Sequence, residues 1–169
     1  KLYEYNYDTP TSLFEAAFFQ WDWLERQREA GALPREADQF NSIHEALVAR
    51  FVEIAGQLPA PLYFAASGGS AEDQGTVDYL RDCAAQAGIE SGSIALEDIG
   101  LSANGRFTAT DDAVIASLFK LYPLEDLFAD EFASALPGSG LRLLEPPWKL
   151  LLSNKGVLPL LWERHRGHP

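Results

Sequence analysis

Several features that define common protein classes are scarce or absent in this sequence. Cys83 is the one cysteine, so neither an internal disulfide nor a cysteine-rich metal site can form, and we expect a cytoplasmic, reducing location. No apolar run approaches the roughly eighteen residues that a membrane-spanning helix needs. Methionine is absent, and the chain opens on Lys1-Leu2-Tyr3 in strand-like alternation. We therefore expect a segment of a longer protein.

Basic side chains are also few. The sequence has 13 Lys and Arg against 25 Asp and Glu, which gives a formal net charge of −12 at pH 7. Such a surface repels nucleic acids and anionic membranes, and it attracts cationic partners such as amines. With 47% hydrophobic and 22% charged residues, the composition is that of a globular chain. A chain of 169 residues is long enough for one core, so we expect a single domain over residues 1–169.

The first third of the chain is predicted to be mainly helical. Residues 2–8 alternate aromatic or apolar with polar side chains, which is typical of a strand with one polar face. Ser12 and Glu15 have the spacing of a capping box, and the apolar periodicity after them predicts a helix to about residue 29. A second helix is predicted over about residues 42–58.

The rest of the chain predicts an α/β fold. An apolar strand at 62–66, a Ser-Gly-Gly-Ser turn, a helix at 72–87 and a strand at 93–96 form a βαβ unit. Asn104-Gly105 is a hairpin-turn signal. The later predicted elements are strands at 113–122 and 141–144, a helix at 124–136, and a helical stretch at 148–162 with a break near Ser153 or Pro159. The predicted fold class is therefore α/β, with a parallel or mixed sheet, βαβ units and a helical N-terminal part.

A candidate metal site lies in the predicted first strand. Glu4, Asn6 and Asp8 alternate with aromatic residues. Alternate side chains of a strand lie on one face, about 6.6–6.8 Å apart. Carboxylate and amide oxygens are ligands that hard divalent cations accept. The pattern predicts a magnesium site, although a solvated strand face would show the same alternation.

A second candidate is the helix start that follows the turn at residues 67–70. This turn lacks the Gly-Lys-Ser ending of a phosphate-binding loop. Glu72 and Asp73 occupy the first helical turn, where their charge satisfies the helix dipole and repels phosphate. A cationic amine suits this corner better. The alternative is that both are ordinary acidic residues at a helix start.

Lys120 stands near the end of a strongly apolar predicted strand. A cation on a buried parallel strand must be paired or must serve an anion, because unpaired burial is costly. Ligands of such sheets also gather where strands end. Lys120 is therefore a candidate site residue, and the alternative is an edge lysine whose stem alone is buried.

The histidines and the cysteine predict neither a zinc site nor a thiol nucleophile. His165 and His168 lie in the last five residues, and no His-x-x-x-His pair is present. His44 stands beside Glu45 and is expected to be a surface or capping residue. Cys83 lies on an apolar helix face, as packed thiols do.

Five blocks of the sequence have counterparts in one known family. They are KLYEYNYDTPTSLFEAAFFQWDWLE, DQFNSIHEALVARF, EDQGTVDYLRDCAAQAG, FKLYPLEDLFADEF and LEPPWKLLLSNKGVLPLLWE. They span nearly the whole chain in the family's order and resemble the synthetase domain of the glutathionylspermidine synthases, which are ATP-grasp carboxylate–amine ligases. The resemblance implies that this chain is the pre-ATP-grasp-like, substrate-binding part of such a ligase.

The family's chemistry is then the expected function. The resemblance implies that ATP phosphorylates a carboxylate, the glycine carboxylate of glutathione in the family's named enzyme, and that an amine, spermidine, attacks the acyl phosphate to form an amide. Magnesium bridges the nucleotide phosphates. The expected cofactors are thus ATP and Mg, and the expected partners are a peptide and a polyamine.

Residue roles also follow from the resemblance. It implies magnesium ligands at Glu4 and Asn6 and substrate-side positions elsewhere. The substrate-side positions are Asp8, Thr11 and Ser12 near the peptide, Glu72 and Asp73 facing the polyamine, and Lys120.

The sequence departs from the family pattern at several points. The Arg-x-Asp segment that precedes KLYEYN in the family is not present, Tyr7 replaces a small residue, and the chain stops at His168-Pro169 before the glycine-rich loop and lysines that would hold ATP. We expect this segment alone to be inactive. The alternatives are a paralogue with another carboxylate and amine, and a non-catalytic polyamine- or peptide-binding module. The sequence leaves a homodimer open.

Overall fold

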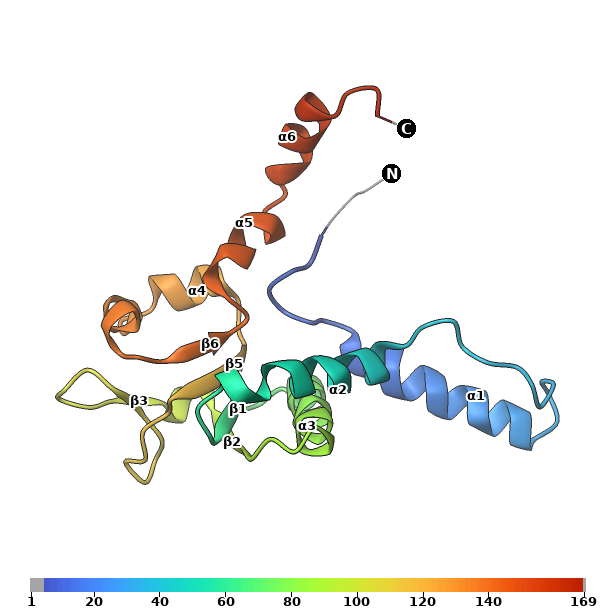
Figure 1. The fold of residues 1–169 in the computed structure, drawn as a ribbon, viewed down its shortest axis with the longest axis horizontal. Helices are drawn as coiled ribbons and strands as arrows, with labels where there is room; N and C mark the ends of the chain where they lie inside the picture. Colours follow the sequence, from blue (N-terminus) through green and yellow to red (C-terminus); the bar gives the residue numbers. More distant parts are fainter. Residues whose placement is uncertain (1–4, 169) are drawn as a thin grey trace.

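The computed structural model describes residues 5–168 and shows a parallel sheet flanked by helices (Figure 1). Four strands lie in the order β2-β1-β5-β6, and every neighbouring pair is parallel. The strands are β1 (Leu62–Ala66), β2 (Ser91–Ala95), β5 (Ser117–Leu121) and β6 (Arg142–Leu144). The predicted α/β class is confirmed, and the sheet is parallel.

The predicted βαβ unit is present at the centre of the chain. Strand β1 is followed by α3 (Ala71–Gln86) and then by β2, which pairs with β1 from Leu62↔Ser91 to Ala66↔Ala95. Ser70 is the N-cap of α3, and its hydroxyl accepts a hydrogen bond from the amide of Asp73. Gly88 follows the helix with φ +77°, a left-handed conformation that favours glycine and ends helices.

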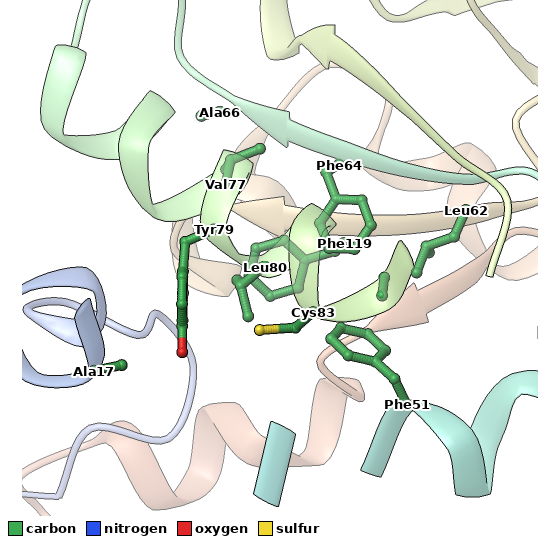
Figure 2. Close-up of a cluster of buried hydrophobic side chains, with 11 residues drawn as sticks. Ala17, Phe51, Leu62, Phe64, Ala66, Val77, Tyr79, Leu80, Cys83 and Phe119 are labelled. Atoms are coloured by element: carbon green, nitrogen blue, oxygen red, sulfur yellow. The ribbon is translucent and has the colours of Figure 1, made fainter. Parts of the chain in front are cut away.

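Hydrophobic side chains cover both faces of the sheet. On one face, Phe64 and Phe119 pack under α2 (Ile43–Ile54) and α3, as Figure 2 shows. On the other face, Ala65, Ile94 and Leu118 pack against the β-hairpin and the loops after it. The central strands β1 and β5 are therefore mainly apolar, as expected for strands covered on both faces.

Shorter elements complete this second face. The hairpin joins β3 (Gly100–Leu101) and β4 (Phe107–Thr108) in antiparallel pairing. Gly105 in its turn has φ +75°, as the Asn-Gly signal predicts. Short helices lie in the loops that follow β2 and β5, namely η3 (Leu96–Asp98), α4 (Leu124–Ala129) and η4 (Ala133–Gly138), whereas η2 (Ala55–Gln57) continues α2.

The N-terminal part differs from the prediction at its start. Residues 5–8 are not in a strand, so the strand predicted for 2–8 is wrong over its described part, and residues 1–4 lie outside the described residues. Tyr5 and Tyr7 stack on each other with ring centroids 4.8 Å apart. Their aromatic alternation thus serves a ring stack in place of sheet pairing.

The first helix begins without the predicted capping box. Ser12 has φ +60° and makes no cap through its side chain, and one carboxylate oxygen of Glu15 is buried without a partner among the described residues. The helix opens as a π-helix, η1 (Glu15–Phe19), and continues as α1 (Gln20–Glu29). Its predicted end near residue 29 is confirmed.

Two breaks shape the C-terminal part. The helix predicted for 124–136 stops after Ala129, because Asp130 adopts an extended conformation and its carboxylate accepts a hydrogen bond from the Phe132 amide. The last helical stretch divides into η5 (Pro147–Lys149), α5 (Leu150–Ser153) and α6 (Val157–Arg164). Of the two predicted positions for its break, the one near Ser153 is confirmed, and Pro159 lies within α6. Among residues 5–168, none of the helices combines the length and apolar character that crossing a membrane requires.

Candidate functional site

The carboxyl ends of the four parallel strands gather charged and polar groups at one edge of the sheet. Ser67 follows β1, Glu97 follows β2, Lys120 lies near the end of β5, and Glu145 follows β6. Ligands of open parallel sheets bind at this edge because the loops there converge and carry unpaired backbone groups. We therefore take the carboxyl edge as the candidate site.

A buried ion pair lies at the centre of this edge. The Lys120 ammonium is fully buried and is ion-paired with the carboxylate of Asp8, which is 7% exposed. The second oxygen of Asp8 accepts a hydrogen bond of 2.6 Å from the backbone amide of Leu124, the first residue of α4. One carboxylate thus joins the N-terminal segment to both β5 and α4.

The surroundings of Lys120 act on its charge in opposite directions. Burial lowers the pKa of Lys120, because a charged ammonium loses its hydration inside the protein, while Asp8 opposes this shift. Glu145, at the end of β6, adds a weaker effect in the same direction as Asp8. The sequence argument that this lysine must be paired is confirmed, and its partner is an internal carboxylate.

A second carboxylate organises the loop between β1 and α3. Glu97 accepts hydrogen bonds from the Ser67 hydroxyl at 2.6 Å and from the Gly68 amide at 3.0 and 3.2 Å. These hydrogen bonds lower the pKa of Glu97, and the bond from Ser67 has the largest effect. The Glu97 carboxylate therefore stays ionised at neutral pH. Because Glu97 already accepts the hydrogen bond of the Gly68 amide, this amide is not free to bind a phosphate. The contact agrees with the sequence argument against a phosphate-binding loop.

A cavity of about 270 Å³ opens beside these groups on the hairpin side of the sheet. Lys120 and Tyr122 of the β5 end line it, together with Glu97 and the acidic pair Asp130 and Glu131. The rest of its wall is mainly apolar. A cavity with apolar walls and a few placed charges is the usual form of a small-molecule site.

The N-terminal segment also contacts the C-terminal segment near this edge. The Tyr7 amide donates a hydrogen bond of 3.1 Å to the Ser153 hydroxyl. The Tyr7 ring lies 5.9 Å from the Trp148 ring and 4.7 Å from the Lys149 ammonium, which is also paired with Glu145. Tyr7, the residue that departs from the family pattern, therefore takes part in packing between the two ends.

The predicted metal ligands are described only in part. Glu4 lies outside the described residues, Asn6 is exposed, and Asp8 is directed to Lys120. Because residues 5–8 are not extended as a strand, Asn6 and Asp8 do not form the predicted ladder of ligands. Over residues 5–168 there is no group of three or more His, Cys, Asp or Glu side chains placed to hold a metal ion.

The predicted substrate residues fall in two places. Asp8 and Lys120 meet at the carboxyl edge, and Thr11 and Ser12 follow Asp8 as exposed residues. Glu72 is exposed and Asp73 is half-buried in the first turn of α3, just after the loop that Glu97 holds. Neither is among the residues that line the 270 Å³ cavity. The roles assigned to these residues remain predictions.

Two features of the structure were missed at the sequence level. Glu97 was not singled out, and nothing in the sequence placed His44 beside Cys83. His44 Nδ1 lies 3.7 Å from the Cys83 sulfur and 3.0 Å from the Tyr79 hydroxyl. Burial raises the pKa of the fully buried Cys83, so its thiol stays protonated and packed. No nucleophile follows from this contact.

Comparison with known proteins gives two informative relatives. A Haemophilus influenzae protein, provisionally named an acid–amine ligase, is 45% identical over 172 residues, an alignment that covers all of this chain and 43% of that protein. Trypanothione synthetase of Crithidia fasciculata is 23% identical over 192 residues, which covers all of this chain and 29% of that enzyme. The chain thus spans less than half the length of these relatives.

The match to a family model covers the chain from end to end. Residues 1–169 match the glutathionylspermidine synthase pre-ATP-grasp family. The parallel sheet with its βαβ unit agrees with the α/β class expected from the resemblance. The chain belongs to the glutathionylspermidine synthase pre-ATP-grasp family.

Proposed function

We propose that the whole protein is an ATP-dependent ligase that joins a carboxylate to an amine, and that residues 1–169 are its substrate-binding α/β domain. The observation that carries the proposal is the family match over the full chain, together with the 45% identity to a protein provisionally named an acid–amine ligase. The charged carboxyl edge supports it, because this is where an α/β sheet presents ligands.

The proposed reaction has two steps. A carboxylate oxygen of the acid attacks the terminal phosphorus of ATP, and ADP leaves, which gives an acyl phosphate. The amine nitrogen then attacks the acyl carbon, inorganic phosphate leaves, and the nitrogen loses a proton to form the amide. A glutathione-like peptide and a spermidine-like amine are the proposed substrates.

The chain's own residues would mainly attract and place the substrates. Glu72 and Asp73 are accessible at the start of α3, and the net charge of −12 favours the approach of a polyamine. Thr11 and Ser12 are exposed beside the buried Asp8 and can contact the peptide. Asp8 and Lys120 neutralise each other, so their part is to hold the N-terminal segment against the carboxyl edge.

Magnesium belongs to the proposal through the family resemblance. Its proposed ligands are Glu4 and Asn6, and of these the described residues supply the amide oxygen of Asn6 alone. One amide oxygen does not make a site for a hard cation, which takes six or more oxygen ligands. The described residues therefore do not by themselves fit the ion, and none of the steps above depends on them for metal binding.

The experiment uses the full-length protein with ATP, Mg²⁺, glutathione and spermidine. Release of ADP and formation of a glutathione–spermidine amide, detected by mass spectrometry, should require all components. The double variant Glu72→Gln/Asp73→Asn should raise the KM for the amine more than that for the peptide, because the carboxylates attract only the cationic substrate. Asp98→Asn, an exposed carboxylate elsewhere on the chain, is the matched control.

Two outcomes would contradict the proposal. Amine and peptide binding without any ATP consumption, over a panel of acids and amines, would favour the non-catalytic binding module. Equal changes in both KM values for the double variant would remove Glu72 and Asp73 from the amine site while leaving the ligase assignment intact.

A further inference from the structure

A second and larger cavity lies on the helical side of the molecule, away from the groups described above. It has a volume of about 640 Å³ and is bounded by η1 and α1, the start of α2, and α3. None of its lining residues is shared with the carboxyl-edge cavity. The family assignment and the proposed reaction leave this cavity without a role.

Aromatic rings form much of its wall. Phe18 and Trp21 remain 46% and 39% exposed, although rings of this size normally bury more of their surface. Tyr79 lies at the base with 8% exposure, and its hydroxyl lies 3.0 Å from His44 Nδ1, on α2. The cavity therefore offers ring faces to an occupant.

The charged groups of the cavity have one sign. Glu45, Asp78 and Asp82 line it, and the described lining residues include no lysine or arginine. Glu45 has no hydrogen-bond partner in the described part of the chain. Asp78 is ion-paired with Arg81, which does not line the cavity, at 3.2 Å, and Asp82 accepts a hydrogen bond of 2.7 Å from Gln86. Besides burial and Cys83, the carboxylates Glu45 and Asp82 raise the pKa of Tyr79, so the negative field reaches the base of the cavity.

The backbone that builds the cavity is unusual. Phe14 packs so closely on α3 that a side chain at Gly75 would come within 3.2 Å of its ring. This contact seats η1, a π-helix, on α3. π-Helical segments are rare and occur frequently at functional sites. Here the π-helix carries Phe18 and leads directly to Trp21.

We propose that this cavity binds an organic ammonium ion, held by the ring faces of Phe18, Trp21 and Tyr79 and by the carboxylates of Glu45, Asp78 and Asp82. Aromatic faces attract cations through the ring quadrupole, and apolar rings suit the methylene or methyl groups of an organic cation better than a hydrated metal ion. The site is separate from the proposed reaction and does not depend on it.

The test measures binding to the full-length protein in the absence of ATP. Tetramethylammonium is the first probe, because it has no N–H and cannot be acylated, and 1,4-diaminobutane is the second. Isothermal titration calorimetry, with KCl at equal ionic strength as the reference, should show saturable binding of both probes. Trp21 fluorescence should change on binding.

Matched variants assign the binding to this cavity. Trp21→Leu should weaken binding roughly tenfold, as expected for loss of a partly desolvated cation–π contact, whereas Trp23→Leu, an exposed tryptophan on the same helix that does not line the cavity, should not. Asp78→Asn/Asp82→Asn should weaken binding by a similar factor, and Asp98→Asn should not. Circular dichroism checks that each variant folds.

The proposal would be overturned by three results. These are no saturable binding of either probe, an equal loss for Trp21→Leu and Trp23→Leu, and a loss with the carboxylate variants alone, which would indicate general electrostatic attraction. Since no turnover is measured, failure of this site would leave the ligase proposal untouched, and failure of the ligase proposal would leave this binding intact.

Discussion

The carboxyl edge of the sheet and the outer surfaces of the helices both carry ion pairs, but in very different surroundings. At the edge, Lys120 and Asp8 have side-chain exposures of 0% and 8% and lie 112 positions apart. On α2, Arg50 and Glu53 are 68% and 67% exposed and lie three positions apart. Water competes with the exposed pair and not with the buried pair. Removing one partner should therefore lower the free energy of unfolding far more at the buried pair than at the exposed one.

The largest expected effect comes from removing one partner of the buried pair. Lys120→Met keeps the volume of the stem but leaves the Asp8 carboxylate buried with only the Leu124 amide as a partner. We expect a loss of about 3–5 kcal/mol in the free energy of unfolding, the usual cost of an uncompensated buried charge. Urea denaturation of the wild type and the variant measures it, and a loss below about 1 kcal/mol would contradict the assigned burial.

Removing both charges should cost much less. In Asp8→Asn/Lys120→Met the asparagine oxygen can still accept the Leu124 hydrogen bond, and no buried charge remains. We expect this variant to recover most of the stability lost in Lys120→Met, because no buried charge is left unpaired. A loss of about 1–3 kcal/mol relative to the wild type should remain, because the side-chain NH2 group of the new asparagine is buried without a partner. A double-mutant cycle completed with Asp8→Asn gives the coupling, and simple additivity would show that the two side chains are independent.

Glu97 should show an intermediate effect that depends on pH. Its pKa is lowered in the folded state from the usual 4.5, so its contribution is complete above that value and is lost as the pH falls through the lowered pKa. Glu97→Gln should therefore unfold at a lower temperature than the wild type at pH 7, and the difference should shrink as the pH falls below 4.5. Thermal unfolding followed by circular dichroism over this range measures it. A difference that does not change with pH would mean that the Ser67 and Gly68 contacts do not depend on the charge.

The surface pair should have the smallest effect. Arg50→Ala removes an exposed contact, so we expect a change of about 0.2–0.5 kcal/mol in the free energy of unfolding. The measurement is the same urea titration, repeated at 1 M NaCl, where the wild-type advantage should vanish because salt screens exposed charges. A loss comparable to that of Lys120→Met would remove the contrast between the two regions.

The central part of the fold could be predicted because its signals are local. The apolar run before the Ser-Gly-Gly-Ser turn, the helical periodicity after it and the glycine at 88 each specify their own element, and together they require parallel pairing of β1 and β2. The hairpin turn at Asn104-Gly105 was predictable for the same reason.

The errors lie where distant residues decide the structure. Alternation at Tyr5 and Tyr7 is compatible with a strand or with a ring stack, and the contact of Tyr7 with Trp148 favours the stack. That Lys120 needs a partner followed from its apolar strand, but nothing in the sequence identified Asp8 as that partner. The shortening of the helix after Ala129 depends on the side chain of Asp130, which can bond to nearby amides in place of continuing the helix.

The reach of the Asp8 carboxylate bears on how the chain is made. Its two partners, Lys120 and Leu124, leave the ribosome more than a hundred residues after it. During synthesis the segment around Asp8 would stay hydrated until β5 and the start of α4 emerge, and it would dock only then although it is made well before them. A pulse-labelling experiment on stalled nascent chains should find this segment protected only once the ribosome has passed well beyond residue 124.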